Sequence, residues 1–173
     1  MRLHTKYTSY NATDARGFTL VEVLVALVIL SVGLLGMAKM VMVSSHSNDS
    51  AYLRSQATAL AYQAMDSMRA NLTASTANGY ITPMGVMPAA TVNCSAVCDS
   101  ATLALSDVYA WKQHLKNALP SGTGSITTSA TFPVIATVVV QWDDSVAQKA
   151  IATATNSAAG ASPQSITLQT VLQ

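Results

Sequence analysis

The sequence has few charged side chains, few aromatic residues and only two cysteines. Of its 173 residues, 10% are charged and 6% are aromatic, whereas 50% are hydrophobic, and the mean hydropathy is +0.34. A chain of this length allows one modest domain and one extended element, which excludes a large enzyme. So little charge favours a membrane-associated or assembling protein over a freely soluble one.

Basic charge is scarce beyond the first segment of the chain. Before Phe18, the three basic residues Arg2, Lys6 and Arg16 face one acidic residue, Asp14, which gives +2. From Phe18 onward, six basic residues face seven acidic ones, which gives −1. A protein that captures nucleic acid needs an excess of Lys and Arg, so this function is disfavoured.

The patterns that usually carry enzymatic chemistry are missing. There is no phosphate-binding loop, no zinc-ligand spacing and no paired acid and base. His46 and His114 are the only histidines after the first segment, and neither has a nucleophile beside it in the sequence. Asp143 and Asp144 could bind calcium, but adjacent carboxylates at a strand end are more typical of solvated turns. We therefore expect no catalytic residue, no cofactor and no metal site.

One long apolar run, residues 18–43, stands out from this background. It is long enough as a helix to cross a hydrocarbon core of roughly 30 Å, yet it carries Glu22 close to its start. An ordinary secretory signal would be cut after its apolar core, and a plain anchor has no use for a carboxylate. A charge at the centre of a span costs about 2.5–3.5 kcal/mol and is usually functional, although a signal anchor with a stray acid is the alternative.

Positive charge on one side of this run predicts its orientation. Arg2, Lys6 and Arg16 precede the run, and the next basic residue is Lys39. By the positive-inside rule, the first segment stays in the cytoplasm, and the chain after about Met42 lies outside the inner membrane.

A helical period continues beyond the apolar run. Apolar residues spaced by three or four predict one helix over residues 18–71, whose C-terminal half buries a stripe against a globular head. We interpret Met65 as core packing, because flexible thioethers fill gaps between a helix and a sheet. The stripe consists of Leu53, Ala57, Leu60, Ala64, Met68 and Leu72.

The remainder reads as a small α+β domain. Residues 73–102 have the composition of a loop, and the spacing of Val108, Trp111 and Leu115 predicts a short helix over residues 101–119. Cys94 and Cys98 form a disulfide if this part is exported, since a metal site would need further ligands that are not nearby. We expect three strands and, between the last two, a mobile loop or a weak strand and a loop over residues 147–164. The predicted strands are 126–131, 134–142 and 165–172.

The segment GFTLVEVLVALVIL, which begins at Gly17, resembles the class III signal of type IV prepilins and type II secretion pseudopilins. The resemblance implies that a membrane prepilin peptidase cuts between Gly17 and Phe18 and methylates the new amine of Phe18. It also implies that Glu22 pairs with the N-terminal amine of a neighbouring subunit and thereby sets the axial register of assembly.

The resemblance implies an α+β, type IV pilin-like lollipop, with a long N-terminal helix packed by its C-terminal half on a small antiparallel sheet. We expect a cytoplasmic leader (1–17), a transmembrane and assembly half of the helix (18–43), an amphipathic half (44–72) and a periplasmic head (73–173). The protein would be a single-pass inner-membrane protein that is later incorporated into the pilus.

A looser resemblance points to the PilV-type minor pilins, the type IV pilus modification proteins. Trp111, Leu119-Pro120, the glycine turn that follows and residues 138–143 carry it. It implies a minor pilin that joins other minor pilins and the major pilin through the N-terminal helix, starts polymerisation in a priming complex and stays near the tip, with a tip adhesin as a further partner. The alternative is a minor pseudopilin of a type II secretion system.

Overall fold

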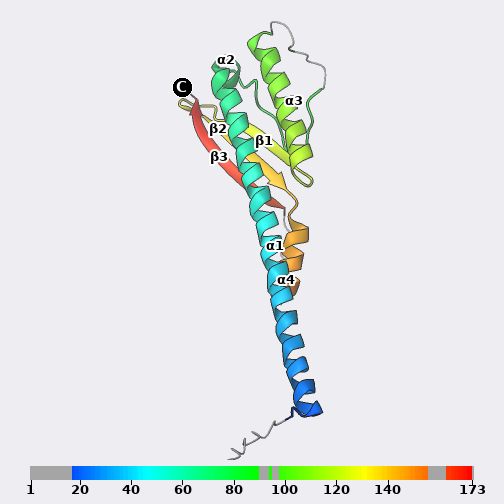
Figure 1. The fold of residues 1–173 in the computed structure, drawn as a ribbon. Coiled ribbons are helices and arrows are strands. Elements are labelled where there is room, and N and C mark those ends of the chain that lie inside the picture. Colours follow the sequence, from blue (N-terminus) through cyan, green and yellow to red (C-terminus); the bar gives the residue numbers. More distant parts are fainter. Residues whose placement is uncertain (1–16, 90–93, 95–97, 156–162, 173) are drawn as a thin grey trace, which may run out of the picture. The chain divides into compact units, whose positions relative to one another are not determined.

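The computed structural model describes residues 17–89, 94, 98–155 and 163–172, which divide between two units, residues 1–40 and 41–173 (Figure 1). The elements are α1 (Leu20–Ala70), α2 (Leu72–Thr76), α3 (Ser100–Ala118), β1 (Thr123–Thr128), β2 (Val134–Trp142), α4 (Ser145–Thr155) and β3 (Gln164–Leu172).

The predicted long helix is confirmed as α1, which has 51 residues. It ends where Asn71 leaves the helical region, with φ −128° and ψ 65°. The Asn71 side chain accepts a hydrogen bond from the Ala74 amide (3.4 Å) and donates one to the Ser100 carbonyl (2.7 Å). Such capping starts a new helix, α2, so the prediction of a loop directly after residue 72 was wrong.

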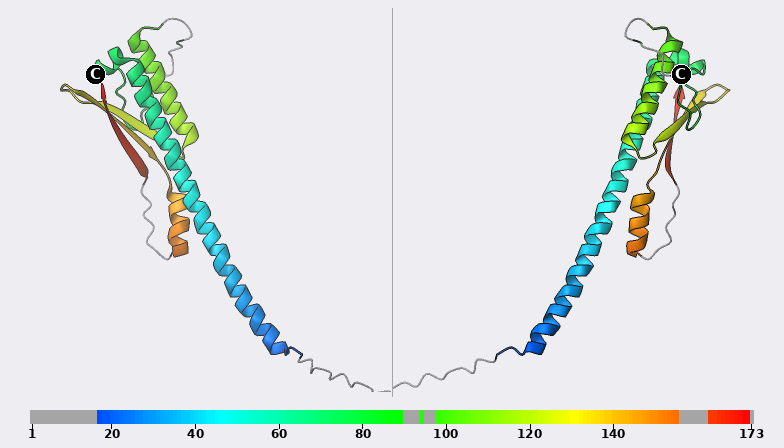
Figure 2. Two further views of the ribbon diagram at one scale, coloured as in Figure 1. Left: turned by 60° about the vertical axis from the view of Figure 1, so that its left-hand side comes forward. Right: turned by 90° about the vertical axis from the view of Figure 1, so that its right-hand side faces the viewer.

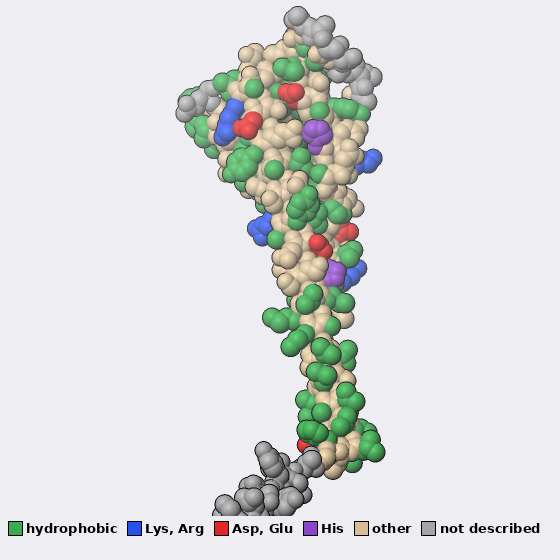
Figure 3. All heavy atoms as spheres, in the orientation of Figure 1, with side chains coloured by type: hydrophobic (Ala, Val, Ile, Leu, Met, Phe, Trp, Pro, Cys, Tyr) green, Lys and Arg blue, Asp and Glu red, His purple; other side chains and the backbone are tan. Residues whose placement is uncertain are grey.

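The described part of the N-terminal unit, residues 17–40, contains the first part of α1, and none of its residues is buried. Every described residue from 17 to 40 is exposed, and hydrophobic side chains cover this part of α1 (Figure 3). By length and composition alone, α1 is able to cross a membrane. Because apolar surface of this extent is unfavourable in water, lipid or other helices must cover it.

In the unit of residues 41–173, the three strands form one antiparallel sheet in the order β1-β2-β3. The central strand, β2, has the predicted bounds, and the predicted third strand is confirmed as β3 with one residue added. The first strand begins and ends three residues earlier than predicted. Side chains of β2 alternate between the core and the other face, as expected of a sheet that is covered on one side. Its buried residues are Ala136, Val138, Val140 and Trp142.

The core lies between this sheet, the part of α1 after residue 56, and α3 (Figure 2). The indole of Trp111 on α3 donates a hydrogen bond to the Leu60 carbonyl of α1 (2.8 Å), which satisfies a buried N–H. Met65 is buried, as the sequence predicts, whereas Leu72 is exposed because it opens α2. The buried residues of α1 are Ala57, Leu60, Ala61, Ala64, Met65 and Met68.

The short helix α3 confirms the prediction for residues 101–119 to within one residue. Asp99 caps its start by accepting a hydrogen bond from the Thr102 amide (2.7 Å). The side chain of Thr102 and then its amide lower the pKa of Asp99 by hydrogen bonding to the carboxylate. After the helix, Gly124 lies against Trp111. A Cβ at Gly124 would lie 2.6 Å from Cη2 of Trp111 and 2.8 Å from the Val139 carbonyl oxygen, so only glycine fits there.

The helix α4 corrects the prediction of a loop or weak strand after residue 147. The Asp143 carboxylate accepts a hydrogen bond from the Ser145 amide (2.8 Å), which starts the helix and lowers the pKa of Asp143. Alanine has the highest helix propensity, and the helix is rich in it; Ala147 and Ala152 are buried. The rest of the predicted loop, residues 156–162, lies outside the described residues.

The described residues therefore form an α+β protein with a long N-terminal helix, whose C-terminal half packs on a small antiparallel sheet. This is the pilin-like fold class that the sequence predicts.

Candidate functional site

The first site lies just before α1, where the chain is not yet helical. Gly17 and Phe18 are exposed, with 83% of the Phe18 surface accessible, and a Cβ added to Gly17 would meet nothing within 4 Å. A peptide bond with such surroundings is sterically open to a protease. Cleavage between Gly17 and Phe18 and methylation of Phe18 stay predictions.

Thr19 caps α1 in a way that the sequence analysis missed. The Thr19 hydroxyl accepts a hydrogen bond from the Glu22 amide (3.2 Å), and the Thr19 carbonyl accepts one from the Val23 amide (3.3 Å). The spacing Thr-x-x-Glu is that of a capping box, and it was readable in the sequence. This cap accounts for the backbone of Glu22 but not for its side chain.

The Glu22 carboxylate has no hydrogen bond or ion pair with any other described residue, and it is exposed. It borders a hollow of about 440 Å³ on α1, where it is the only charged group among the described residues. The first turn of a helix stabilises a negative charge through its free amides and the helix dipole. Such a carboxylate can bind a cation that is brought to it from outside the chain segment described here. The hollow is lined by Phe18, Glu22, Val23, Ala26, Leu27 and Leu30.

The two cysteines are joined, in agreement with the predicted disulfide. Cys94 and Cys98 form a disulfide with their Cα atoms 5.6 Å apart. Among the described residues, no group of three or more His, Cys, Asp or Glu side chains could hold a metal ion.

The acidic pair after β2 is divided between two environments. Asp143 is exposed and caps α4, but Asp144 is only 4% exposed, so the expectation of two solvated turn residues was wrong for Asp144. Asp144 accepts a hydrogen bond from the Ser50 hydroxyl of α1 (2.6 Å), while its second carboxylate oxygen has no partner in the described part of the chain. Every second residue of β2 from Ala136 to Trp142 is buried, and Asp144 continues this alternation. The two-residue period of the strand was therefore the sequence signal for the burial of Asp144.

Lys112 is a buried lysine that the sequence did not single out. It is 4% exposed, and its ammonium donates hydrogen bonds to the carbonyls of Pro83 (2.7 Å) and Gly124 (2.8 Å). Burial lowers the pKa of Lys112, because a charged ammonium loses its hydration there. The side chain thus joins α3, the segment before residue 84 and β1.

Tyr80 makes a second buried polar connection. Its hydroxyl donates to the Asp107 carboxylate of α3 (2.6 Å) and lies 3.2 Å from the Ser67 carbonyl of α1. Burial, together with the hydrogen bond to Asp107, raises the pKa of Tyr80 well above its usual range. Tyr80 and Lys112 thus each join separate elements of the domain.

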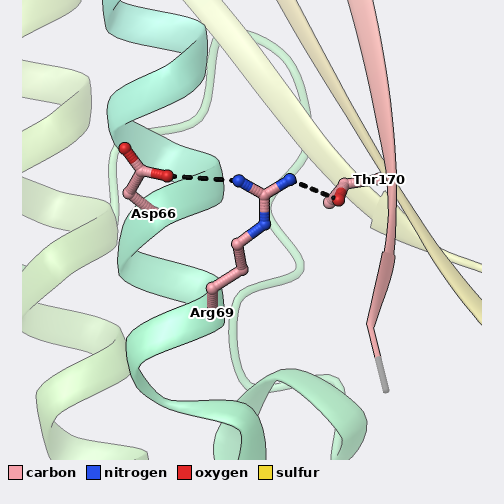
Figure 4. A network of polar contacts seen from close by, with 3 residues as sticks. All are labelled: Asp66, Arg69 and Thr170. Atoms are coloured by element: carbon pink, nitrogen blue, oxygen red, sulfur yellow. Dashed lines mark hydrogen bonds and ion pairs between the residues drawn. The ribbon is translucent and has the colours of Figure 1, made fainter.

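Other polar contacts join elements at the surface. Arg69 pairs with Asp66 (3.3 Å) and donates to the Thr170 hydroxyl of β3 (2.8 Å), which ties the end of α1 to the sheet (Figure 4). His114 on α3 lies 3.3 Å from the Gln63 side chain of α1. These contacts position elements and hold no reactive group.

A family model described as the prokaryotic N-terminal methylation motif matches residues 13–38. The match includes Gly17, Phe18 and Glu22, the residues of the site at the start of α1. No curated protein and no solved structure matches the chain. The motif belongs to structural proteins and not to enzymes, and together with the apolar helix and the fold it supports a membrane-anchored, type IV pilin-like protein.

Proposed function

We propose that the protein is a PilV-type minor pilin, which helps to start type IV pilus assembly in a priming complex and stays near the tip of the fibre. It joins other minor pilins and the major pilin through α1, with a tip adhesin as a further partner. The methylation motif and the pilin-like fold support the class, and the resemblance around Trp111 and residues 138–143 supports the type.

The proposed pathway begins at the inner membrane. The leader, residues 1–17, stays in the cytoplasm, residues 18–43 span the membrane, and residues 44–173 lie in the periplasm. A prepilin peptidase cuts between Gly17 and Phe18 and methylates the new amine. The exposure of this peptide bond is compatible with such processing.

The observation that carries the proposal is the carboxylate of Glu22, which has no ion-pair partner in the described part of the chain and lies beside an otherwise apolar helix surface. Cleavage creates a positive amine at Phe18, and the amine of a neighbouring subunit can pair with Glu22. An unpaired charge in an apolar environment is costly, so subunits that align these two groups are favoured over subunits that are out of register.

The first experiment is mass spectrometry of the N-terminus of the protein purified from membranes. The proposal predicts a chain that begins at N-methylated Phe18. A chain that keeps Met1, or one that is cut after the apolar run, would remove the assembly mechanism.

A second experiment separates the charge of Glu22 from its place in the helix cap. Glu22→Gln keeps the size of the side chain but removes the charge, and we expect a processed, inserted protein that assembles poorly. Thr19→Val is the matched control: it removes the cap, which costs about 1 kcal/mol, but it leaves the carboxylate and should assemble. Equal loss of piliation in both variants would assign the effect to capping, and normal piliation of Glu22→Gln would refute the register role.

A minor pseudopilin of a type II secretion system shares the N-terminal motif, and deletion of the protein distinguishes the two functions. Loss of surface pili with normal release of exoproteins supports the minor pilin. Loss of exoprotein release with normal pili would assign the protein to secretion instead.

A further inference from the structure

The two edges of the sheet differ in how they are covered. At the outer edge of β1, Ile126 exchanges two backbone hydrogen bonds with Thr82 (3.1 and 3.0 Å). Close by, the Gly124 carbonyl accepts a hydrogen bond from the Lys112 ammonium (2.8 Å). An uncovered edge invites pairing with other chains, and these contacts protect β1 from it.

The same contacts reveal which backbone groups of β2 point toward β3. Because the amide and carbonyl of Ile126 bond to Thr82, these two backbone groups point away from β2. Val138 lies opposite Ile126, so the amide and carbonyl of Val138 point toward β3. The hydrogen bond from the Ser129 amide to the Ile135 carbonyl (2.8 Å) agrees, because Ile135 has the opposite parity to Val138. Ala136, Val138 and Val140 therefore bond to β3.

The register of β2 and β3 then identifies the outward groups of β3. Residues 136, 138 and 140 lie opposite residues 170, 168 and 166, so these residues of β3 bond inward. Their neighbours direct both the amide and the carbonyl outward, away from the sheet. The outward residues are Ser165, Thr167, Gln169 and Val171.

Nothing in the described part of the chain covers this outer edge of β3. None of its outward backbone groups forms a hydrogen bond with another described residue. The strand has nine residues in continuous register, with no charged residue, no proline and no bulge. The usual devices that prevent edge pairing are therefore missing from β3, although they are present on β1.

The two faces of β3 show which kind of segment would fit. On the core face, Ile166 and Leu168 are only partly buried, although they pack against the hydrophobic core. On the other face, Ser165, Thr167 and Gln169 are exposed and polar, and Val171 is exposed and apolar. A fourth strand with apolar side chains toward the core and polar side chains on the other face would complete the cover of Ile166 and Leu168.

We propose that the outer edge of β3 accepts an extended segment of a different pilin-like subunit as a fourth strand. Strand addition of this kind gains affinity from backbone hydrogen bonds and specificity from alternate side chains. The assignment of the partner to the pilin class rests on the proposed function, whereas the open edge itself does not.

Symmetric pairing of two copies through this edge would be antiparallel. Within the unit of residues 41–173, the end of α1 contacts the end of β3 through Arg69 and Thr170, and this part of α1 runs in the same direction as β3 (Figures 1 and 2). Antiparallel pairing of β3 with β3 would therefore also reverse this part of α1 in one copy relative to the other. Under the proposed function, the heads of subunits in one complex share one orientation, so we assign the added strand to another subunit.

Hydrogen exchange of the full mature chain tests the edge directly. Exchange is measured in detergent and in complexes that co-purify with other pilin-like subunits. We expect the outward amides of Ser165, Thr167, Gln169 and Val171 to exchange at least about tenfold more slowly in the complexes. The inward amide of Leu168 should be protected in both samples, which shows that β3 is folded. Equal exchange of the outward amides in the two samples would overturn the proposal.

A pair of lysine variants tests the same edge by association. Thr167→Lys places a charge on the open edge, and Thr127→Lys places one on the same exposed face but on β1, whose edge is covered. We expect Thr167→Lys to weaken association about tenfold or more, which corresponds to about 1.4 kcal/mol, and Thr127→Lys to change it less than about twofold. Equal effects would refute the edge assignment, and cross-links between β3 of two copies would refute the partner.

The outcomes also separate this inference from the proposed function. If the protein joins pilin assemblies while the outward amides of β3 stay unprotected, only the edge inference fails. If the protein is absent from all pilin assemblies, the proposed function fails and takes the partner class with it.

Discussion

Removal of one hydroxyl group tests how the domain is held together. The Tyr80 side chain is 1% exposed, and its hydroxyl connects α3 to the segment after α2 through Asp107 (2.6 Å). Tyr80→Phe keeps the ring but leaves the Asp107 carboxylate without this donor. Hydrogen bonds to charged groups contribute about 1.5–3 kcal/mol, and Asp107 is half-exposed, so water replaces part of the loss. We expect the free energy of unfolding to fall by about 1–2 kcal/mol.

The raised pKa of Tyr80 makes the free energy of unfolding depend on pH at high pH. Burial first, and then the hydrogen bond to Asp107, raises this pKa in the folded state, whereas an unfolded tyrosine titrates at about 10. The stability that the hydrogen bond of protonated Tyr80 gives to the folded state is therefore fully present below about pH 10. It is lost as the pH rises further, because the unfolded state then releases a proton that the folded state retains.

Tyrosinate absorbance during an alkaline titration measures both effects. In folded protein just above pH 10, wild type and Tyr80→Phe should give the same absorbance, and a difference of one tyrosinate should appear only on unfolding. Tyr109→Phe is the control, because among the described residues the Tyr109 hydroxyl accepts a hydrogen bond only from the Gln113 side chain (2.8 Å), and Tyr109 is less buried than Tyr80. If Tyr80 titrates near 10 in folded protein, our account of its burial is wrong.

Two further perturbations test contacts elsewhere in the domain. Ser50→Ala removes the donor to the buried Asp144, and it should lower the free energy of unfolding, measured with denaturant, by about 1–3 kcal/mol. The control Ser47→Ala changes an exposed residue of α1 and should change this free energy by less than about 0.5 kcal/mol. Equal effects of the two variants would contradict the role of the contact between Ser50 and Asp144. Reduction of the Cys94–Cys98 disulfide opens a very short loop, so the free energy of unfolding should fall by about 2 kcal/mol. The circular dichroism signal of the sheet should persist. Unfolding of the domain on reduction would contradict our view that this disulfide stabilises only its own loop.

Periodic features of the sequence were sufficient to predict most elements. The apolar run and the stripe that follows it predicted α1, and alternation over residues 134–142 predicted β2 with its correct ends. These signals are strong because a helix or strand that buries one face must repeat its apolar residues with the period of its backbone. The α+β fold class followed from the order of these elements.

Features that depend on one side chain or on tertiary contacts were missed. The helix α4 was expected as a mobile loop, or as a weak strand and a loop, because alanine, serine and threonine carry little periodic contrast. Its start depends on the Asp143 cap. The burial of Lys112 depends on two carbonyls that only the folded chain brings to it. The Thr19 cap was readable from the spacing Thr-x-x-Glu, but the sequence analysis considered Glu22 only as a charge.

The free energies of burying the first part of α1 show whether Glu22 can decide its entry into an apolar environment. Seventeen large hydrophobic side chains between residues 18 and 42 are exposed, and their burial would contribute roughly 25–50 kcal/mol. One carboxylate costs about 2.5–3.5 kcal/mol even at the centre of a span, so it cannot decide whether the helix enters an apolar environment.

Glu22 can, however, determine the axial register between neighbouring helices. When one apolar helix slides along another, apolar contacts are exchanged for similar ones, and the net change in their free energy is small. Separation of Glu22 from a neighbour's amine has no such compensation, because each group is left as an unpaired charge. The apolar surface therefore drives association, and under the proposed function the few kcal/mol at Glu22 are sufficient to select one alignment. Glu22→Gln should thus leave membrane insertion intact while it impairs ordered assembly, and loss of insertion in this variant would contradict the comparison.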